Sequence, residues 1–167
     1  MSGLRPILGL LAVVVLIATA CSTADPNAQI DPIGPDRATF KPVGLALMQR
    51  CGSIDCHGSR YRNMRLYGFG GIRLDPNDRP DTPKTTPAEL DADYDAVIGV
   101  EPEIMRAVAL AKGAGSDRLT FIRKGRGEES HKGGNPITAG DDADVCIQSW
   151  FRGVVDADAC QRVVDAP

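Results

Sequence analysis

The segment PVGLALMQRCGSIDCHG, residues 42–58, places a short helical pattern directly before two cysteines and a histidine. Proline suits the first turn of a helix, and the apolar residues after it are compatible with one short helix that ends near Cys51. Such a helix would bring Cys51, Cys56 and His57 to its C-terminal end. The segment therefore predicts a helical domain whose first helix leads into a cluster of reactive side chains.

The second half of the chain carries further helical patterns. Residues 86–99 begin with Thr86 as an N-cap, a proline at the first helical position and Glu89 three residues after the cap, and Gly99 ends the pattern. Comparable patterns cover residues 101–113, with Met105 predicted in the core, a shorter stretch capped by Ser116, and residues 141–153. Their apolar residues recur at helical spacing, which predicts packed amphipathic helices.

The remaining segments are shorter or irregular. Residues 63–75 alternate apolar and charged side chains around glycines and predict a small hairpin or two extended pieces, while the proline-rich residues 75–87 predict a loop. A final short turn is expected to carry Cys160. The sequence therefore predicts a mainly α fold with long loops.

The first 20 residues have the pattern of a secretory signal peptide. One positive charge, Arg5, precedes an apolar run over residues 7–17, and small residues follow before Cys21. The run is shorter than the roughly 20 apolar residues that span a bilayer, and small residues suit a signal peptidase. An uncut membrane anchor is the alternative interpretation.

The end of this signal, ATAC at residues 18–21, resembles the lipobox of bacterial lipoproteins. The resemblance implies that Cys21 takes lipid, with Ala18 standing where the family prefers leucine. Acyl chains would then hold the protein at a membrane. Ser22, rather than aspartate, implies sorting to the outer membrane, facing the periplasm, where the organism has one.

The chain length of 167 residues fits one folded domain of ordinary size. Residues 1–20 form the signal peptide, and residues 21–39, with several prolines and no apolar period, predict a flexible tether. Residues 40–167 are expected to hold the helical domain. Removing the signal takes one basic residue from 19 basic and 22 acidic side chains, so the mature chain is mildly acidic, which argues against a polybasic nucleic-acid-binding protein.

Four cysteines remain besides Cys21, an even number that suits an oxidising compartment. Cys146 and Cys160 are close in sequence, and a structural disulfide between them is the simplest prediction. Cys51 and Cys56 leave more than one interpretation open, because a disulfide, a covalent cofactor or a metal ion would each account for the pair.

The residues CGSIDCHG resemble the haem-attachment motif of c-type cytochromes, C-x-x-C-H, in a longer C-x4-C-H variant. In that family the two thiols bind the vinyl groups of haem, and the histidine beside the second cysteine binds the iron. The resemblance implies one covalent haem c held by Cys51 and Cys56, with His57 as the proximal iron ligand.

A second stretch, residues 130–153, is similar to the distal loop and last helix of small c-type cytochromes. His131 stands where that family usually has a methionine, followed by glycines and a proline-containing step. The resemblance implies a small cytochrome c-like helical domain in which His57 and His131 both bind iron, with a lower potential than a His/Met site. It covers residues 43–58 and 130–153 but not residues 59–129.

On this interpretation the protein transfers electrons to or from a redox partner protein and is not an enzyme. The sequence shows no nucleophile–base pair and no phosphate-binding loop, which argues against hydrolysis and nucleotide binding. Two alternatives stay open. One is a cofactor-free envelope lipoprotein with a Cys51–Cys56 disulfide and a binding or structural role; the other is a zinc or copper site of Cys51, Cys56, His57 and His131.

Four arginines follow the motif and are candidates for binding haem propionates, because a guanidinium matches carboxylate geometry. They are Arg60, Arg62, Arg65 and Arg73. The alternative is that they are solvated or pair with the many aspartates.

Overall fold

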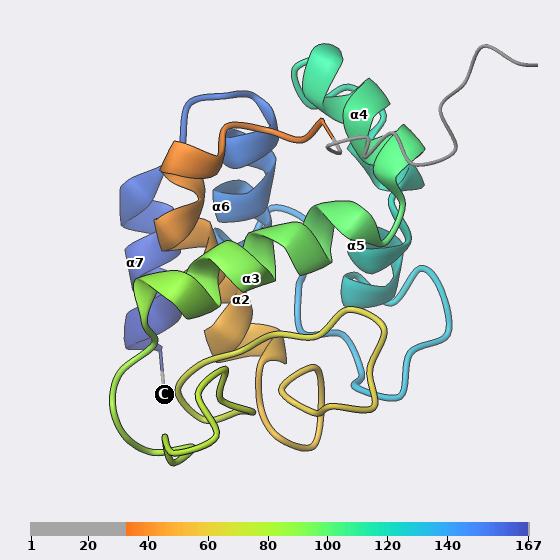
Figure 1. Ribbon diagram of the computed structural model, residues 1–167. Helices are drawn as coiled ribbons and strands as arrows, with labels where there is room; N and C mark the ends of the chain where they lie inside the picture. Colours follow the sequence, from red (N-terminus) through yellow and green to blue (C-terminus); the bar gives the residue numbers. More distant parts are fainter. Residues whose placement is uncertain (1–32, 167) are drawn as a thin grey trace, which may run out of the picture. The chain divides into compact units, whose positions relative to one another are not determined.

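The computed structural model describes residues 33–166 (Figure 1). The expectations for the signal peptide, the lipidated Cys21 and most of the tether lie outside the described residues. Within this part the fold is mainly α, with six α-helices and no strands, and the predicted fold class is confirmed. None of the described helices is long and apolar enough to cross a membrane.

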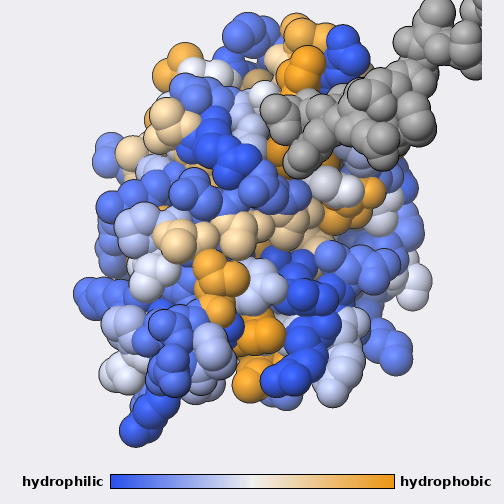
Figure 2. Space-filling model, in the orientation of Figure 1, coloured by the Kyte–Doolittle hydropathy of each residue, from blue (hydrophilic) through white to orange (hydrophobic). Residues whose placement is uncertain are grey.

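The helices are connected by two long loops that lie toward the lower end of the molecule in Figure 1. In chain order the elements are η1 (Arg37–Thr39), α2 (Phe40–Cys51), α3 (Pro87–Gly99), α4 (Pro102–Leu110), η2 (Ser116–Arg118), α5 (Thr120–Gly125), α6 (Asp142–Phe151) and α7 (Ala157–Asp165). The first long loop joins α2 to α3, and the second joins α5 to α6. Figure 2 shows that hydrophilic side chains cover most of this face, with apolar side chains gathered below α3.

Aromatic side chains from three helices form the centre of the core. The ring centroids of Phe40 and Trp150 lie 5.0 Å apart, and those of Phe40 and Tyr94 lie 5.4 Å apart. The Tyr94 hydroxyl donates to the Pro35 carbonyl at 2.8 Å, and Trp150 Nε1 donates to the Asp36 carbonyl at 3.2 Å. Buried aromatic rings contribute both area and specific geometry, so this cluster holds α2, α3 and α6 together and fixes the residues before α2.

The C-terminal segment differs from the prediction, because Cys160 lies in a helix, α7, rather than in a short turn. Asp156 caps that helix by accepting from the Ala159 N–H at 2.9 Å, and Ala159, Cys160 and Val163 are buried. The predicted disulfide between Cys146 and Cys160 is confirmed and joins α6 to α7. The aspartate cap and the spacing of the buried residues are the signals that identify α7.

The capping box predicted for α3 is confirmed. The Thr86 hydroxyl accepts from the Glu89 N–H at 3.3 Å, while Glu89 Oε2 accepts from the Thr86 N–H at 2.8 Å. Residues 63–75 contain one isolated bridge, between Tyr67 and Ile72, and it is parallel, so the possible hairpin does not form. Met105 is buried in the core, as predicted.

The helix predicted to begin after Ser116 is divided in two. Leu119 has extended backbone angles, which separate η2 from α5. The Glu101 carboxylate accepts hydrogen bonds from the N–H and the hydroxyl of Thr120, and so takes the place of the predicted Ser116 cap. The side chain that caps α5 thus comes from 19 residues earlier in the chain, so a local sequence pattern does not reveal where α5 begins.

Candidate functional site

The first long loop turns back on itself directly after α2. The His57 N–H donates to the Cys51 carbonyl at 2.9 Å, and the Cys56 N–H donates to the Ser53 carbonyl at 2.9 Å. These bonds compress the four residues between the cysteines into a tight turn. Cys51, Cys56 and His57 therefore gather at the C-terminal end of α2, as the sequence predicts.

Three glycines make this compact turn sterically possible. A Cβ on Gly58 would lie 2.0 Å from the Gly52 carbonyl oxygen and 2.7 Å from the Gly71 Cα. A Cβ on Gly71 would lie 2.3 Å from the same oxygen. Because glycine has no Cβ, residues 68–72 can pack directly against the Cys51–Gly58 turn. They also form a hydrogen bond with it, in which the Ile72 N–H donates to the Gly58 carbonyl at 2.7 Å.

His57 is held by the chain that follows it. Its Nδ1 lies 2.7 Å from the Met64 carbonyl oxygen, and its own carbonyl accepts from the Leu66 N–H at 2.9 Å. A carbonyl oxygen only accepts, so Nδ1 carries the proton and Nε2 keeps its lone pair. Burial lowers the pKa of His57, an effect that the Met64 hydrogen bond only partly opposes, and this favours the neutral ring.

His131 is oriented in the same way from the second long loop. Its Nδ1 lies 3.1 Å from the Gly134 carbonyl oxygen, which again leaves Nε2 without a proton in the neutral ring. A Cβ on Gly133 would come within 2.8 Å of the His131 ring, so the glycine at this position makes room for the side chain. Histidines that bind metals commonly donate the other ring N–H to a carbonyl, and both histidines have this arrangement.

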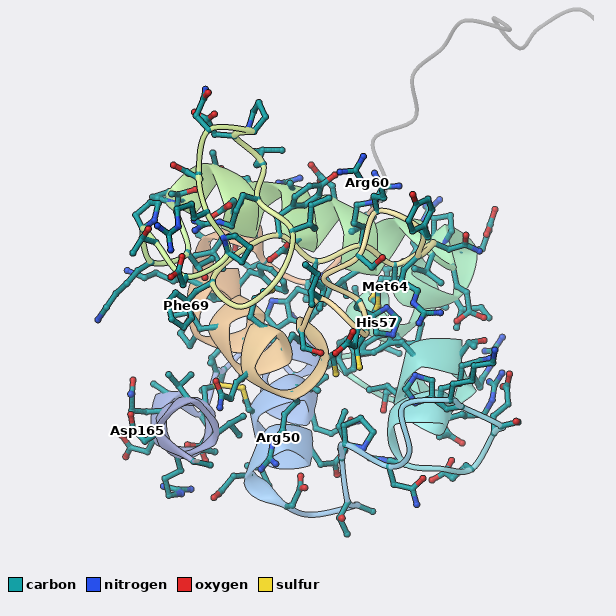
Figure 3. The ribbon with its side chains drawn as sticks, turned by 90° about the horizontal axis from the view of Figure 1, so that it is seen from below. Arg50, His57, Arg60, Met64, Phe69 and Asp165 are labelled. Atoms are coloured by element: carbon teal, nitrogen blue, oxygen red, sulfur yellow. A yellow bond between two sulfur atoms is a disulfide. The ribbon has the colours of Figure 1, made fainter. Side chains whose placement is uncertain are left out.

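The two imidazole rings face the same space. Their centroids are 6.0 Å apart, their planes differ by 27°, and the rings are stacked. With a metal–nitrogen bond of about 2.0 Å and a ring nitrogen about 1.1 Å from the ring centre, two imidazoles on opposite sides of one ion would have centroids about 6.2 Å apart, so the separation matches. Such ligands direct ring nitrogens at the ion, whereas stacked rings present their faces, so the rings would have to turn for both Nε2 atoms to reach one ion. Figure 3 shows His57 beside Met64, between α2 and α5.

A cavity of about 720 Å³ opens at this point, and both cysteines of the motif and both histidines line it. This volume lies within the roughly 300–1,000 Å³ that is typical of cofactor and small-molecule sites. Apolar lining comes from Leu47, Met64, Phe121 and Ile137, and basic lining from Arg62, Lys124 and Lys132. The cavity therefore combines apolar walls, two free imidazole nitrogens and positive charge.

Both cysteines of the motif are free thiols, Cys51 buried and Cys56 half-buried. The structure therefore lacks the Cys51–Cys56 disulfide of the alternative interpretation. Burial, with a smaller effect of Cys56, raises the pKa of Cys51 to about 12. In residues 33–166 no cluster of three or more His, Cys, Asp or Glu is arranged to hold an ion.

The four arginines have different environments. Arg73 is 7% exposed and forms a bidentate pair with Glu89, with Nε–Oε1 and Nη2–Oε2 distances of 2.7 and 3.0 Å. Arg73 also lies 3.9 Å from an Asp78 carboxylate oxygen, so the alternative of pairing with carboxylates applies to it, with the buried Glu89 of α3 as its main partner.

Of the other three arginines, Arg62 alone lines the cavity. Arg65 instead donates to the Arg60 carbonyl at 2.9 Å. Lys124 and Lys132 also line the cavity but were not identified from the sequence. The signal for Lys132 is its place next to His131, whereas Lys124 reaches the cavity only through the position of α5.

A comparison with protein families, curated proteins and solved structures found no match. The function is therefore inferred from the geometry of the site.

Proposed function

We propose that this protein carries one covalent haem c and transfers electrons. Cys51 and Cys56 would bind the haem, and His57 and His131 would be its axial iron ligands. The observation that carries this proposal is the pair of imidazoles, 6.0 Å apart, with both Nδ1 atoms bonded to backbone carbonyls and both rings lining a cavity that also contains two free thiols.

The residues that line the cavity suit the different parts of a haem. The thiols of Cys51 and Cys56 match its two vinyl positions, and the apolar walls suit a porphyrin face. Arg62, Lys124 and Lys132 supply positive charge for its propionates. Lys124 already lies 3.3 Å from a Glu129 carboxylate oxygen, so Arg62 and Lys132 are the more available cations.

Haem supplies a one-electron iron couple when bound. The Met64 and Gly134 carbonyls hold the His57 and His131 imidazoles in place, which would limit their reorganisation when the charge of the site changes. If both imidazoles bound the iron, they would leave no open position for a substrate, which favours electron transfer over catalysis. The lipobox-like Cys21 supports a lipid anchor, and Ser22 supports a position on the outer membrane, facing the periplasm, where the organism has one. A redox partner protein would dock there.

The test is a pyridine haemochrome spectrum of the mature protein, secreted from a host that attaches c-type haem. We expect the α band of thioether-linked haem in the wild type and its loss in the variant Cys51→Ala with Cys56→Ala. Cys146→Ala with Cys160→Ala is the matched control, because this pair lies in the α6–α7 disulfide, outside the cavity lining, and haem attachment should persist. A folded, colourless wild-type protein would contradict the proposal and favour a cofactor-free envelope lipoprotein.

A further inference from the structure

A carboxyl group with incomplete hydrogen bonding is buried close to the site. Asp93, on α3, is 0% exposed. Its Oδ1 accepts from the Tyr67 N–H at 2.6 Å, while its Oδ2 is buried and has no hydrogen-bond partner among the described residues. A buried carboxylate oxygen without a partner is costly, whereas a protonated carboxyl is much less so.

No cation compensates Asp93 from its own helix. Glu89 lies one turn before it, carries the same sign of charge and is already paired with Arg73. Burial raises the pKa of Asp93 to about 8. The hydrogen bond from the Tyr67 N–H opposes this increase, whereas the negative charge of Glu89 adds to it. Asp93 therefore holds its proton to a much higher pH than an exposed aspartate.

The neighbouring elements do not supply a counter-ion either. From the loop, Arg65 directs its guanidinium to the Tyr67 hydroxyl at 3.2 Å and to a backbone carbonyl, and its Nε is itself buried without a partner. From α2, the charged residues Lys41 and Arg50 are both exposed. The part of the chain that the structure describes contains no ion pair to Asp93.

Asp93 is connected to His57 through a short piece of backbone. It binds the N–H of Tyr67; the preceding residue, Leu66, donates its N–H to the His57 carbonyl at 2.9 Å. Met64 in the same segment accepts the His57 Nδ1 proton at 2.7 Å. One end of residues 64–67 thus orients the histidine, and the other end is fixed by Asp93.

From this arrangement we propose that Asp93 is a redox-linked proton-binding residue, which takes up one proton as the site takes up one electron. The inference rests on the proposed function. The electron comes from the redox partner and reduces iron(III) to iron(II); the proton comes from solvent and converts the Asp93 carboxylate to a carboxylic acid. Oxidation returns both.

The direction of the coupling follows from charge. The oxidised site carries one more positive charge, which favours the Asp93 carboxylate, so the reduced site binds the proton more tightly. Burial keeps solvent and salt from screening this interaction. The reduction potential should therefore fall as pH rises through the titration of Asp93.

The experiment measures the midpoint potential of the haem-containing protein as a function of pH. We expect the wild-type potential to fall around pH 8, where a tenfold difference in proton affinity between the redox states corresponds to about 59 mV. Asp93→Asn should abolish this part of the pH dependence. Asp91→Asn, an exposed carboxylate on the same helix, should retain it. Equal pH dependence in the wild type and in Asp93→Asn would overturn the inference while the haem proposal stands.

A second measurement covers the case in which Asp93→Asn does not fold. Carbon-detected NMR of the Asp93 carboxyl gives its titration midpoint in the oxidised, the reduced and the haem-free Cys51→Ala, Cys56→Ala chains. We expect a raised midpoint in the haem-free chain and a higher midpoint in the reduced than in the oxidised protein. Identical midpoints in both redox states would refute the coupling. A colourless wild-type protein would refute the proposed function, and the coupling with it, even where Asp93 titrates normally in the haem-free chain.

Discussion

Replacing Glu89 with glutamine should destabilise the protein strongly, although the substitution preserves the shape of the side chain. Glu89 is 1% exposed and accepts hydrogen bonds from Arg73, from the Leu74 N–H at 3.2 Å and from the Thr86 N–H at 2.8 Å. Arg73 in turn donates to the Arg79 and Pro83 carbonyls. The ion pair therefore joins the start of α3 to the loop before it. Glu89→Gln removes the close counter-charge of a buried guanidinium and leaves only Asp78, at 3.9 Å.

Two considerations give the size of the loss in unfolding free energy. Burial alone would raise the pKa of Glu89, but hydrogen bonds from Arg73, Thr86 and Leu74 outweigh it and lower that pKa from 4.5 to about 2. Each pKa unit corresponds to about 1.4 kcal/mol, so the charged form of Glu89 contributes about 3 kcal/mol. Removing one partner of a buried ion pair typically costs about 3–5 kcal/mol, which agrees with the value from the pKa of Glu89.

Urea denaturation at pH 7 measures this loss as a lower midpoint with an unchanged slope. Asp91→Asn is the control: this side chain is 68% exposed, so we expect a change of less than about 0.5 kcal/mol. The pKa of Glu89 is lower in the folded than in the unfolded chain. Its contribution to the free energy of unfolding is therefore fully present above about pH 4.5 and is lost as the pH falls toward 2. Glu89→Gln should therefore also lose part of the acid sensitivity. A variant within 1 kcal/mol of wild type at pH 7 would refute the reasoning.

Three further predictions concern the site and the core. Gly58→Ala should cost about 1–3 kcal/mol in urea denaturation because its Cβ meets backbone atoms, whereas Gly99→Ala, with open space around it, should not destabilise; equal effects would contradict this steric role. Cys146→Ala with Cys160→Ala opens a loop with a sequence separation of 14 and should lower the unfolding free energy by about 3 kcal/mol; an unchanged melting temperature would argue against it. His131→Ala should turn the optical spectrum of the haem protein from low spin to high spin, with added imidazole restoring it; an unchanged spectrum would mean that another group is the sixth ligand.

Local interactions explain the parts of the fold that the sequence predicts well. The capping box of α3 involves residues three apart, and the Cys146–Cys160 bridge joins neighbouring elements, so both leave a recognisable pattern. The start of α5 was mispredicted because the Glu101 carboxylate that caps it comes from another turn. The helix around Cys160 was missed although its Asp156 cap is local, because the segment is short and rich in charged residues.

The candidate site also has features that depend on local sequence and features that depend on residues distant in sequence. The sequence by itself determined its reactive groups, since Cys51, Cys56 and His57 are adjacent and His131 is the remaining histidine. It also determined the glycines that the tight turn requires. These features depend on residue type and spacing, which a linear pattern contains.

Only the tertiary structure decided how these groups are used. It places His57 and His131 across one cavity, although they come from different loops, and it shows their Nδ1 atoms bonded to carbonyls. It also distinguishes exposed Arg62 from buried Arg73, and it buries Asp93 without a counter-ion. Burial and charge pairing depend on side chains that are distant in sequence, so no local pattern determines them.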